Sequence, residues 1–216
     1  MSATTLRITE IFYSLQGEAR TVGCPTVFVR LTGCPLRCQY CDTAYAFSGG
    51  VIYDLEQVIQ EVKGYNTRYV TVTGGEPLAQ VNCIPLLTAL CDLGYEVSLE
   101  TAGVMDVSKV DARVVKVMDL KTPGSLEMDR NLESNIGYLN AHDQVKFVIC
   151  NHEDYLWARA RVEEYDLGKK VADVLFSPSN EELKASELAE WILADQLNVR
   201  MQVQLHKYLW GNRPGH

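Results

Sequence analysis

Short apolar runs rich in β-branched residues recur along the chain and predict the strands of a sheet. The runs span residues 27–31, 69–73, 96–100, 114–120, 145–150, 171–176 and 201–205. Short runs without regular polar alternation are typical of strands that are buried on both faces of a parallel sheet. The pattern therefore predicts about six or seven parallel strands.

Helix-like segments separate these strands. Apolar residues repeat at helical spacing over residues 55–62, and Asp54 with Gln57 three residues later resembles a capping box. Further helices are expected over residues 83–92, 154–165 and 181–195. Alternating strands and helices predict an α/β fold with right-handed crossovers, in which a ligand binds at the carboxyl ends of the strands. No repeat or linker divides the chain, so we expect a single domain over residues 1–216.

Composition and charge narrow the kinds of partner. The 216 residues are 47% hydrophobic and 22% charged, with a net charge of −8, which suits a globular domain but not a binder of polyanions. No run of Lys and Arg stands out, so we expect a small-molecule or protein substrate and no nucleic acid. No apolar run approaches the roughly 18 residues of a membrane helix, and the first residues do not read as an export signal. We therefore expect no membrane partner and a cytoplasmic location.

The cysteines suggest metal chemistry. There are seven, an odd number without an export signal, which argues against a framework of disulfides. Three of them, Cys34, Cys38 and Cys41, lie within eight residues directly after the first predicted strand. Three thiolates would leave one iron of a four-iron cubane without a protein ligand, and a reactive site requires such an open position. Spacing alone leaves a structural zinc site open, with Cys24 or a histidine as its fourth ligand.

A glycine pair follows the second predicted strand in the segment TGGEP (residues 73–77). Glycines at a strand end allow a ligand to approach the backbone, although this motif alone would also fit an ordinary turn. Together with the C-x3-C-x2-C motif, it resembles the radical SAM superfamily. The resemblance implies a 4Fe–4S cluster on Cys34, Cys38 and Cys41, with the open iron chelated by S-adenosylmethionine (SAM). In that superfamily, an electron from the cluster cleaves SAM into methionine and a 5′-deoxyadenosyl radical.

Further segments narrow the resemblance to one family. They are FYSLQGE (12–18), VRLTGC (29–34), CDT (41–43), ETAG (100–103), DLK (119–121), QVKFV (144–148), FSPSN (176–180) and QLHKY (204–208). This set resembles the 7-carboxy-7-deazaguanine synthase family over nearly the whole chain. The resemblance implies a shortened, incomplete parallel β/α barrel of the radical SAM type. It also implies conversion of 6-carboxy-5,6,7,8-tetrahydropterin into 7-carboxy-7-deazaguanine and ammonia.

In this family the reaction is a radical ring contraction in queuosine and 7-deazapurine biosynthesis. The deoxyadenosyl radical removes hydrogen from the pterin, the substrate radical rearranges and recovers hydrogen, and ammonia is lost later. SAM is thus used catalytically. The resemblance also implies a Mg²⁺ ion, a homodimer and an electron donor such as flavodoxin.

A substrate-binding set follows from the resemblance. Its members are Leu15, Gln16, Gly17, Glu18, Arg30, Thr73 and His206. Arg30 suits the substrate carboxylate because a guanidinium can bind both oxygens. Gln16 and Glu18 can hydrogen-bond the amide and amino groups of the pterin. Each residue alone would also fit an ordinary polar group at a surface or strand end.

The resemblance also assigns SAM contacts and a magnesium ligand. The SAM set is Tyr40, Cys41, Asp42, Gly75, Glu76, Asp119, Leu120, Lys121, Ser177 and Asn180, and Thr43 is the Mg²⁺ ligand. One hydroxyl is a reasonable protein ligand because Mg²⁺ usually keeps waters and substrate oxygens around it. Two alternatives remain: Glu76 could hold its loop by accepting backbone hydrogen bonds, and Lys121 could be a solvated surface lysine. Asp119-Leu120 stands where the family often has Ser-Pro.

Two other functions fit part of this pattern. A glycyl-radical activating enzyme would share the cluster and the SAM chemistry but has no use for a pterin-binding set. A non-catalytic zinc-binding module would use the cysteines alone. The resemblance assigns no catalytic side chain beyond the cluster and substrate ligands. The four scattered cysteines, Cys24, Cys83, Cys91 and Cys150, are expected to be small buried apolar residues.

Overall fold

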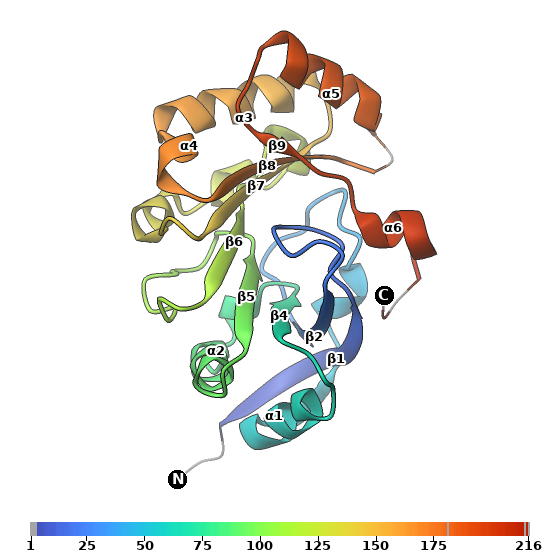
Figure 1. Cartoon of the computed structure of the whole chain (residues 1–216), viewed down its shortest axis with the longest axis vertical. Coiled ribbons are helices and arrows are strands. Elements are labelled where there is room, and N and C mark those ends of the chain that lie inside the picture. The colour runs from blue at the N-terminus through green and yellow to red at the C-terminus, as the bar shows by residue number, and fades with distance from the viewer. Residues whose placement is uncertain (1–3, 181, 214, 216) are drawn as a thin grey trace.

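The computed structural model describes residues 4–180, 182–213 and 215, and its centre is a nine-stranded sheet (Figure 1). The strands are β1 (Thr5–Leu15), β2 (Pro25–Leu31), β3 (Val51–Asp54), β4 (Tyr69–Gly74), β5 (Glu96–Thr101), β6 (Val115–Asp119), β7 (Gln144–Ile149), β8 (Asp173–Pro178) and β9 (Arg200–Met201). Their order is β3-β1-β2-β4-β5-β6-β7-β8-β9. Strands β2 and β4 to β9 run parallel, as predicted, whereas β1 pairs antiparallel with β2 and β3. Because the sheet ends at β3 and β9 without closing, the β/α barrel is incomplete.

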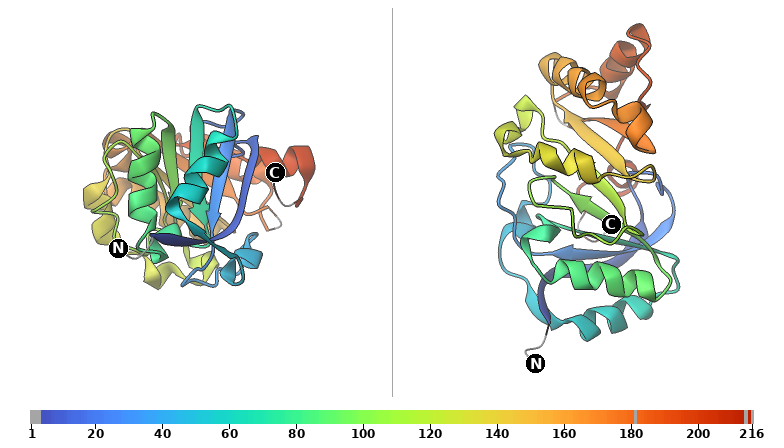
Figure 2. Two further views of the ribbon diagram at one scale, coloured as in Figure 1. Left: turned by 90° about the horizontal axis from the view of Figure 1, so that it is seen from below. Right: turned by 90° about the vertical axis from the view of Figure 1, so that its left-hand side faces the viewer.

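Helices flank the sheet, and α1 to α5 cover its outer face. They are α1 (Leu55–Lys63), α2 (Cys83–Asp92), α3 (His152–Glu164), α4 (Leu167–Lys170), α5 (Ala185–Ala194) and α6 (Leu205–Trp210), and the 3₁₀ helices are η1 (Ala44–Phe47), η2 (Pro77–Ala79), η3 (Pro123–Ser125), η4 (Met128–Arg130) and η5 (Glu133–Tyr138). In the right-hand view of Figure 2, α1, α2 and α3 follow one another along one face of the sheet. The predicted capping box of Asp54 and Gln57 forms at the start of α1. Over the described ranges, no helix has the length and apolar character needed to cross a membrane.

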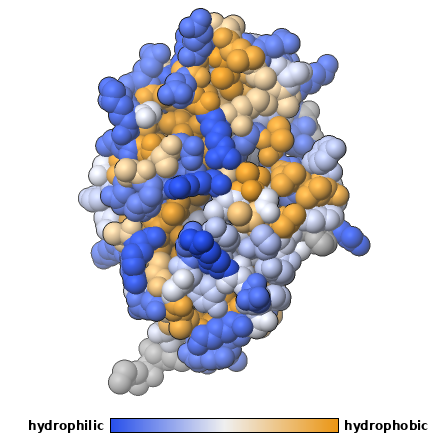
Figure 3. Space-filling view, in the orientation of Figure 1, coloured by the Kyte–Doolittle hydropathy of each residue, from blue (hydrophilic) through white to orange (hydrophobic). Residues whose placement is uncertain are grey.

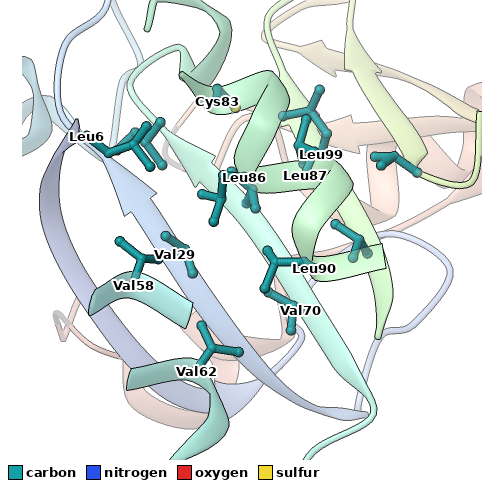
Figure 4. Packing of buried hydrophobic residues seen from close by; sticks show 14 of the residues in the cluster. Leu6, Val29, Val58, Val62, Val70, Cys83, Leu86, Leu87, Leu90 and Leu99 are labelled. Carbon is teal, nitrogen blue, oxygen red and sulfur yellow. The ribbon is translucent and has the colours of Figure 1, made fainter. Parts of the chain in front are cut away.

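Two apolar clusters hold the helices to the sheet. In the first, α1 and α2 pack on β2, β4 and β5; Val58 of α1, Leu86 of α2 and Val70 of β4 are fully buried there (Figure 4). In the second, α3, α4 and α5 cover β6 to β8, and Tyr155 of α3 packs edge-on against Phe176. Burying an apolar side chain of this size contributes about 1.5–3 kcal/mol. The outer layer therefore fixes the sheet whose inner face carries the polar residues.

The loop after β1 covers part of that inner face. Ala19 is 3% exposed and packs on Val117 of β6 and Leu175 of β8. Its N–H donates to Oε1 of Gln202 at 2.9 Å. The loop thus crosses from the antiparallel edge of the sheet to its parallel half, and it carries Glu18 toward β7.

The structure differs from the predicted elements at several places. Strands β1 and β3 are not predicted, because they are only partly buried and lack a continuous apolar run. The predicted strand 201–205 is confirmed only at Met201: β9 spans Arg200–Met201, and Leu205 begins α6. Within the described chain, no α-helix joins β5 to β6, and 3₁₀ helices join β6 to β7. The helix expected over 181–195 begins at Ala185, and residue 181 lies outside the described residues.

Candidate active site

A cavity of about 640 Å³ lies at the carboxyl ends of the parallel strands, where this type of fold binds its ligands. The predicted residues that line it are Leu15, Gln16, Gly17, Glu18, Arg30, Cys34, Cys38, Tyr40, Cys41, Asp42, Thr43, Thr73, Gly75, Asp119, Lys121, Ser177, Asn180 and His206. They come from strands and loops along the whole chain, so residues far apart in the sequence meet around one space. Two predicted residues, Glu76 and Leu120, do not line it.

The three cysteines lie on the loop after β2, and two contacts shape that loop. The guanidinium of Arg37 donates to the carbonyl oxygen of Cys34 at 2.9 Å, and its Cζ lies 4.2 Å from the ring centre of Phe47. The TGGEP loop packs on the same segment: a Cβ at Gly75 would lie 2.4 Å from the carbonyl oxygen of Gly33. Residue 75 must therefore be glycine for the two loops to touch.

The three thiols are free to bind a metal cluster. All three are free; burial raises the pKa of Cys34 and Cys41, and it raises the pKa of Cys38 to about 11. Such thiols stay protonated until a metal displaces the proton. Among the described residues, no group of three or more His, Cys, Asp or Glu side chains forms a site for one metal ion. A cubane, by contrast, takes each thiolate on a different iron.

Three residues of the predicted SAM set carry buried polar atoms that have no partner among the described residues. These atoms are Oη of Tyr40, Oδ1 of Asp119 and Oγ of Ser177. Buried polar atoms are nearly always hydrogen-bonded, so unpaired ones on residues that line a cavity are suited to a bound ligand. The amino, carboxylate, hydroxyl and adenine groups of SAM would match them. Lys121 is 7% exposed and donates to Oδ2 of Asp119 at 2.9 Å, so it is not a solvated surface lysine.

Glu76 and Leu120 lie behind the cavity wall. Glu76 is 0% exposed. Its carboxylate accepts hydrogen bonds from the N–H groups of Leu78 and Ala102 and from the hydroxyl of Thr101. It therefore ties the TGGEP loop to the end of β5, as the alternative interpretation expects. Leu120 is 2% exposed and belongs to the second apolar cluster. This geometry does not support a side-chain contact between either residue and SAM, which leaves only their main-chain atoms for such a contact.

Arg30 is held so that part of its guanidinium remains for a ligand. Its Nε donates to Oε1 of Glu10 at 2.7 Å, and the same oxygen accepts from the hydroxyl of Tyr45 at 2.7 Å. Its Cζ lies 5.7 Å from the ring centre of Phe12 and 5.8 Å from that of Tyr45. The two terminal nitrogens make no hydrogen bond or ion pair within the described part of the chain. They can bind a carboxylate in the bidentate geometry.

The segment before β2 joins the C-terminal helix at the cavity wall. A Cβ on Gly17 would lie 2.0 Å from Nδ1 of His206, so only glycine admits the imidazole there. Burial lowers the pKa of His206, which favours the neutral ring. Gln16 is 4% exposed, and its Nε2 donates to Oγ1 of Thr71 at 3.0 Å. An amide nitrogen carries two hydrogens, so this bond leaves one of them for a second acceptor.

The predicted magnesium ligand lies beside a carboxylate. The hydroxyl of Thr43 donates to Oδ1 of Asp42 at 2.8 Å, and Nζ of Lys207 lies 3.0 Å from Oδ2 of Asp42. Burial alone would raise the pKa of Asp42, but Lys207 and neighbouring hydrogen bonds hold it well below its usual range. Hydroxyl and carboxylate oxygens are ligands that Mg²⁺ prefers, and the ammonium of Lys207 already balances the charge of Asp42.

Several residues of the wall were not predicted. Glu100 of β5 and Lys146 of β7 line the cavity, and Nζ of Lys146 lies 2.7 Å from Oε2 of Glu18. The signal in the sequence is a charged residue inside a strand that is expected to be buried on both faces. Other lining residues outside the predicted set include Phe12, Phe28, Tyr45, Gln204 and Lys207.

Comparison with known proteins agrees with this geometry. The model of the Radical SAM superfamily matches residues 28–120. The chain is 44% identical over 208 residues to the 7-carboxy-7-deazaguanine synthase of Chlorobaculum tepidum, with 95% of this chain and 94% of that one covered. It is 39% identical over 219 residues to the protein of the same name from Koribacter versatilis, with 95% and 97% covered.

A solved structure shares the fold. The crystal structure of QueE from Escherichia coli matches with a TM-score of 0.74 at 23% sequence identity, over 94% of this chain and 95% of that chain. At that identity the likeness shows the fold, which is the shortened parallel β/α barrel. The two relatives, at higher identity and nearly full coverage, show the family. The chain therefore belongs to the radical SAM superfamily and, within it, to the 7-carboxy-7-deazaguanine synthase family.

Proposed function

We propose that this protein converts 6-carboxy-5,6,7,8-tetrahydropterin into 7-carboxy-7-deazaguanine and ammonia by radical ring contraction. It is then a carbon–nitrogen lyase of queuosine and 7-deazapurine biosynthesis. The observation that carries the proposal is a cavity that joins three thiols on one loop to the unpaired guanidinium nitrogens of Arg30. Relatives 44% and 39% identical bear the name of this activity.

One part of the cavity wall suits the cofactors. Cys34, Cys38 and Cys41 would hold the 4Fe–4S cluster, and Tyr40, Asp119, Lys121 and Ser177 offer polar groups to SAM. When bound, these cofactors supply the 5′-deoxyadenosyl radical that begins the reaction. Gly75 keeps the TGGEP loop against the cysteine loop, so both cofactors would be bound by segments that already touch.

The other part of the wall suits the pterin. Arg30 would bind the substrate carboxylate with its terminal nitrogens, while Glu10 holds its Nε. Thr73 and His206 offer hydrogen bonds to the pterin edge, where donors and acceptors alternate. Gln16 keeps one hydrogen of its Nε2 for the pterin, and the segment from Leu15 to Glu18 can add main-chain contacts.

We assign Mg²⁺ to Thr43, with the carboxylate of Asp42 beside it. Thr43→Val keeps the side-chain shape and removes the oxygen, so the rate should lose most of its dependence on Mg²⁺ concentration. The measurement is the turnover rate in metal-free buffer against a Mg²⁺ titration, with Thr67→Val, a surface threonine outside the cavity, as the control. An unchanged titration curve in Thr43→Val would overturn the assignment.

The two alternative functions are not favoured. A zinc-binding interaction module does not account for membership in a radical SAM family or for a cavity of about 640 Å³ beside the cysteines. A glycyl-radical activating enzyme acts on a protein backbone and needs no guanidinium held inside a cavity. Neither relative compared above bears the name of an activating enzyme.

The test of the proposal is anaerobic reconstitution. The protein is loaded with iron and sulfide, given SAM, reductant, Mg²⁺ and the tetrahydropterin, and examined for 7-carboxy-7-deazaguanine by mass spectrometry. Cys38→Ala should abolish the product, whereas Cys91→Ala, on α2 and outside the cavity, should not. Cleavage of SAM without this product would retain the radical chemistry and overturn the substrate.

We also propose four properties of the whole molecule: one domain over residues 1–216, a homodimer, reduction by a donor such as flavodoxin, and a cytoplasmic location. The continuous sheet beneath both apolar clusters supports a single domain. Val203, Tyr208 and Leu209 are exposed in and beside α6, where Figure 3 shows apolar surface, and they support contact with a second copy. Seven free thiols suit a reducing compartment.

A further inference from the structure

Five ionisable side chains meet on the inner face of the sheet and line the cavity. They are Glu18 of the loop after β1, Glu100 of β5, Asp119 of β6, Lys121 just after β6 and Lys146 of β7. Nζ of Lys146 lies at the centre, 2.7 Å from Oε2 of Glu18. The same nitrogen is 3.8 Å from Oδ2 of Asp119 and 3.9 Å from Oε2 of Glu100.

Glu100 differs from the other carboxylates of this group. Both oxygens of Glu18 accept hydrogen bonds, from Lys146 at 2.7 Å and from Gln204 at 2.6 Å. Asp119 accepts one from Lys121 at 2.9 Å. Neither oxygen of Glu100 accepts a hydrogen bond from any described residue. Its side chain is 18% exposed, and that exposure is to the cavity it lines.

The five side chains are electrically neutral together when one of the three carboxylates carries a proton. Three carboxylates face two ammonium groups, and the carboxylate without a hydrogen-bond donor gains least from being ionised. Burial raises the pKa of Glu100 to about 7; the charges of Glu18 and Asp119 act in the same direction, and those of Lys146 and Lys121 act against it. Although burial works against it, the neighbouring carboxylates raise the pKa of Lys146 well above its usual value. Lys146 therefore stays charged while Glu100 can gain or lose a proton near neutral pH.

We propose that Glu100 is the acid–base catalyst of the step in which ammonia leaves the ring-contracted substrate. The inference rests on the proposed function, because that reaction requires a proton to be moved from carbon to nitrogen. A carboxyl group that titrates near the working pH is suited to accept and then return a proton. Nζ of Lys146 lies 3.9 Å from Oε2 of Glu100, beyond hydrogen-bonding distance, so the carboxylate oxygens stay open to a ligand in the cavity.

The step balances without an oxidant or reductant. Product and ammonia together contain the atoms of the substrate. Ionised Glu100 accepts a proton from a ring carbon, and the electron pair of that C–H bond forms the new carbon–carbon double bond. The neighbouring C–N bond breaks with its electron pair on nitrogen, and Glu100 returns the proton to that nitrogen, which leaves as ammonia.

The rival proton acceptor at the wall is His206. Its pKa is lowered by burial, so it is neutral at the working pH and could accept a proton. It lies against Gly17, in the part of the wall assigned to the pterin edge. A His206→Gln variant is therefore compared with the Glu100 variants in the test.

The test separates ammonia release from substrate consumption. Glu100→Gln keeps the side-chain size and removes the ionisation; Glu96→Gln, on the same strand but paired with Arg68 at the surface, is the matched control. Each reconstituted variant is followed through one turnover for pterin loss, product and ammonia. In Glu100→Gln we expect pterin loss near the wild-type rate and product and ammonia slowed by about 10²–10⁴-fold. An isomer of the substrate should accumulate.

Two further readouts distinguish catalysis from a structural role. Wild-type ammonia release should fall as the pH drops through about 7, where Glu100 gains its proton, and Glu100→Gln should lack this limb. Glu100→Ala should recover ammonia release when acetate is added, because the small carboxylate can occupy the vacated position.

Three outcomes would overturn the proposal. Pterin loss and ammonia release slowed equally in Glu100→Gln would make Glu100 a binding or folding residue. Unchanged ammonia release in Glu100→Gln would mean that another residue transfers the proton. The same conclusion would follow if His206→Gln, and not Glu100→Gln, lost the fall in ammonia release at low pH. Absence of 7-carboxy-7-deazaguanine from the wild type and from Glu96→Gln would overturn the proposed function itself, a result distinct from a defect confined to the Glu100 variants.

Discussion

At the residue scale, ion pairs fix how individual side chains point into the cavity. Glu10 and Arg30 stand opposite each other on β1 and β2, and their side chains are 22% and 15% exposed. A pair so shielded from water interacts more strongly than one on an open surface. Glu10 does not line the cavity, yet it fixes which guanidinium nitrogens face inward. We therefore regard Glu10 as a positioning residue for Arg30.

Glu10→Gln should raise KM for the pterin roughly tenfold and leave kcat nearly unchanged. The neutral amide weakens a charge-assisted hydrogen bond by about 1–2 kcal/mol, and 1.4 kcal/mol corresponds to a factor of ten. Steady-state kinetics over a range of pterin concentrations measures both constants. Glu56→Gln on α1 is the control, since among the described residues Glu56 accepts a side-chain hydrogen bond only from Gln60, at the surface. A lower kcat with KM unchanged would speak against a positioning role.

Gly17→Ala should impair pterin binding while leaving the cluster intact. The added methyl group would collide with Nδ1 of His206, so the imidazole and the start of α6 must move. Iron content and the visible absorbance of the reconstituted protein should match the wild type, whereas KM for the pterin should rise. Gly168→Ala is the control, because a Cβ there meets no atom within 4 Å. Equal loss of iron in Gly17→Ala would mean that the substitution disturbs the whole fold.

Individual site residues could be predicted where they belong to a short sequence motif. The cysteines and TGGEP qualify because cluster and SAM chemistry demand particular residues at short spacing within a loop. Lys146 and Glu10 could not be predicted, since their roles depend on partners brought near by the fold. Lys146 acquires its role only when the loop after β1 places Glu18 within 2.7 Å of it.

At the scale of elements, the loop after β1 determines how the inner face is filled. The parallel strands could be predicted within a few residues because burial on both faces requires continuous apolar runs. β1 could not, because its side chains face the core at only a few positions. The path of the following loop is likewise set by tertiary contacts: Ala19 adopts a φ of 61° and is buried on Val117 and Leu175.

Two substitutions at position 19 should have opposite outcomes. Ala19→Val places a β-branched residue at positive φ and overpacks the contact, which should cost roughly 1–3 kcal/mol of the free energy of unfolding. Ala19→Gly relieves the backbone and removes only one methyl group, so it should remain near the wild type. Urea unfolding of the cluster-free protein measures the difference. If glycine destabilises as much as valine, the backbone conformation is not what limits this position.

At the scale of the whole molecule, the cavity connects two halves that pack separately. The first apolar cluster holds β1 to β5 with α1 and α2, and the second holds β6 to β8 with α3 to α5. The cavity takes Arg30 and Thr73 from the first half and Asp119, Lys146 and Ser177 from the second. The shortened crossovers around β6 leave few helices to join the halves on the outer side. A ligand that contacts both walls should therefore couple their stabilities.

Binding of SAM to the reconstituted protein should slow amide hydrogen exchange in β4 and β7 by similar factors. At about 100 times its dissociation constant, a ligand stabilises the folded state by about 2.7 kcal/mol, which slows exchange through global opening about a hundredfold. Mass spectrometry of peptides covering Tyr69–Gly74 and Gln144–Ile149 measures the two halves. Cys38→Ala, which cannot complete the cluster, should show little protection in either peptide. Protection confined to one peptide would mean that the halves open independently and that SAM contacts one wall alone.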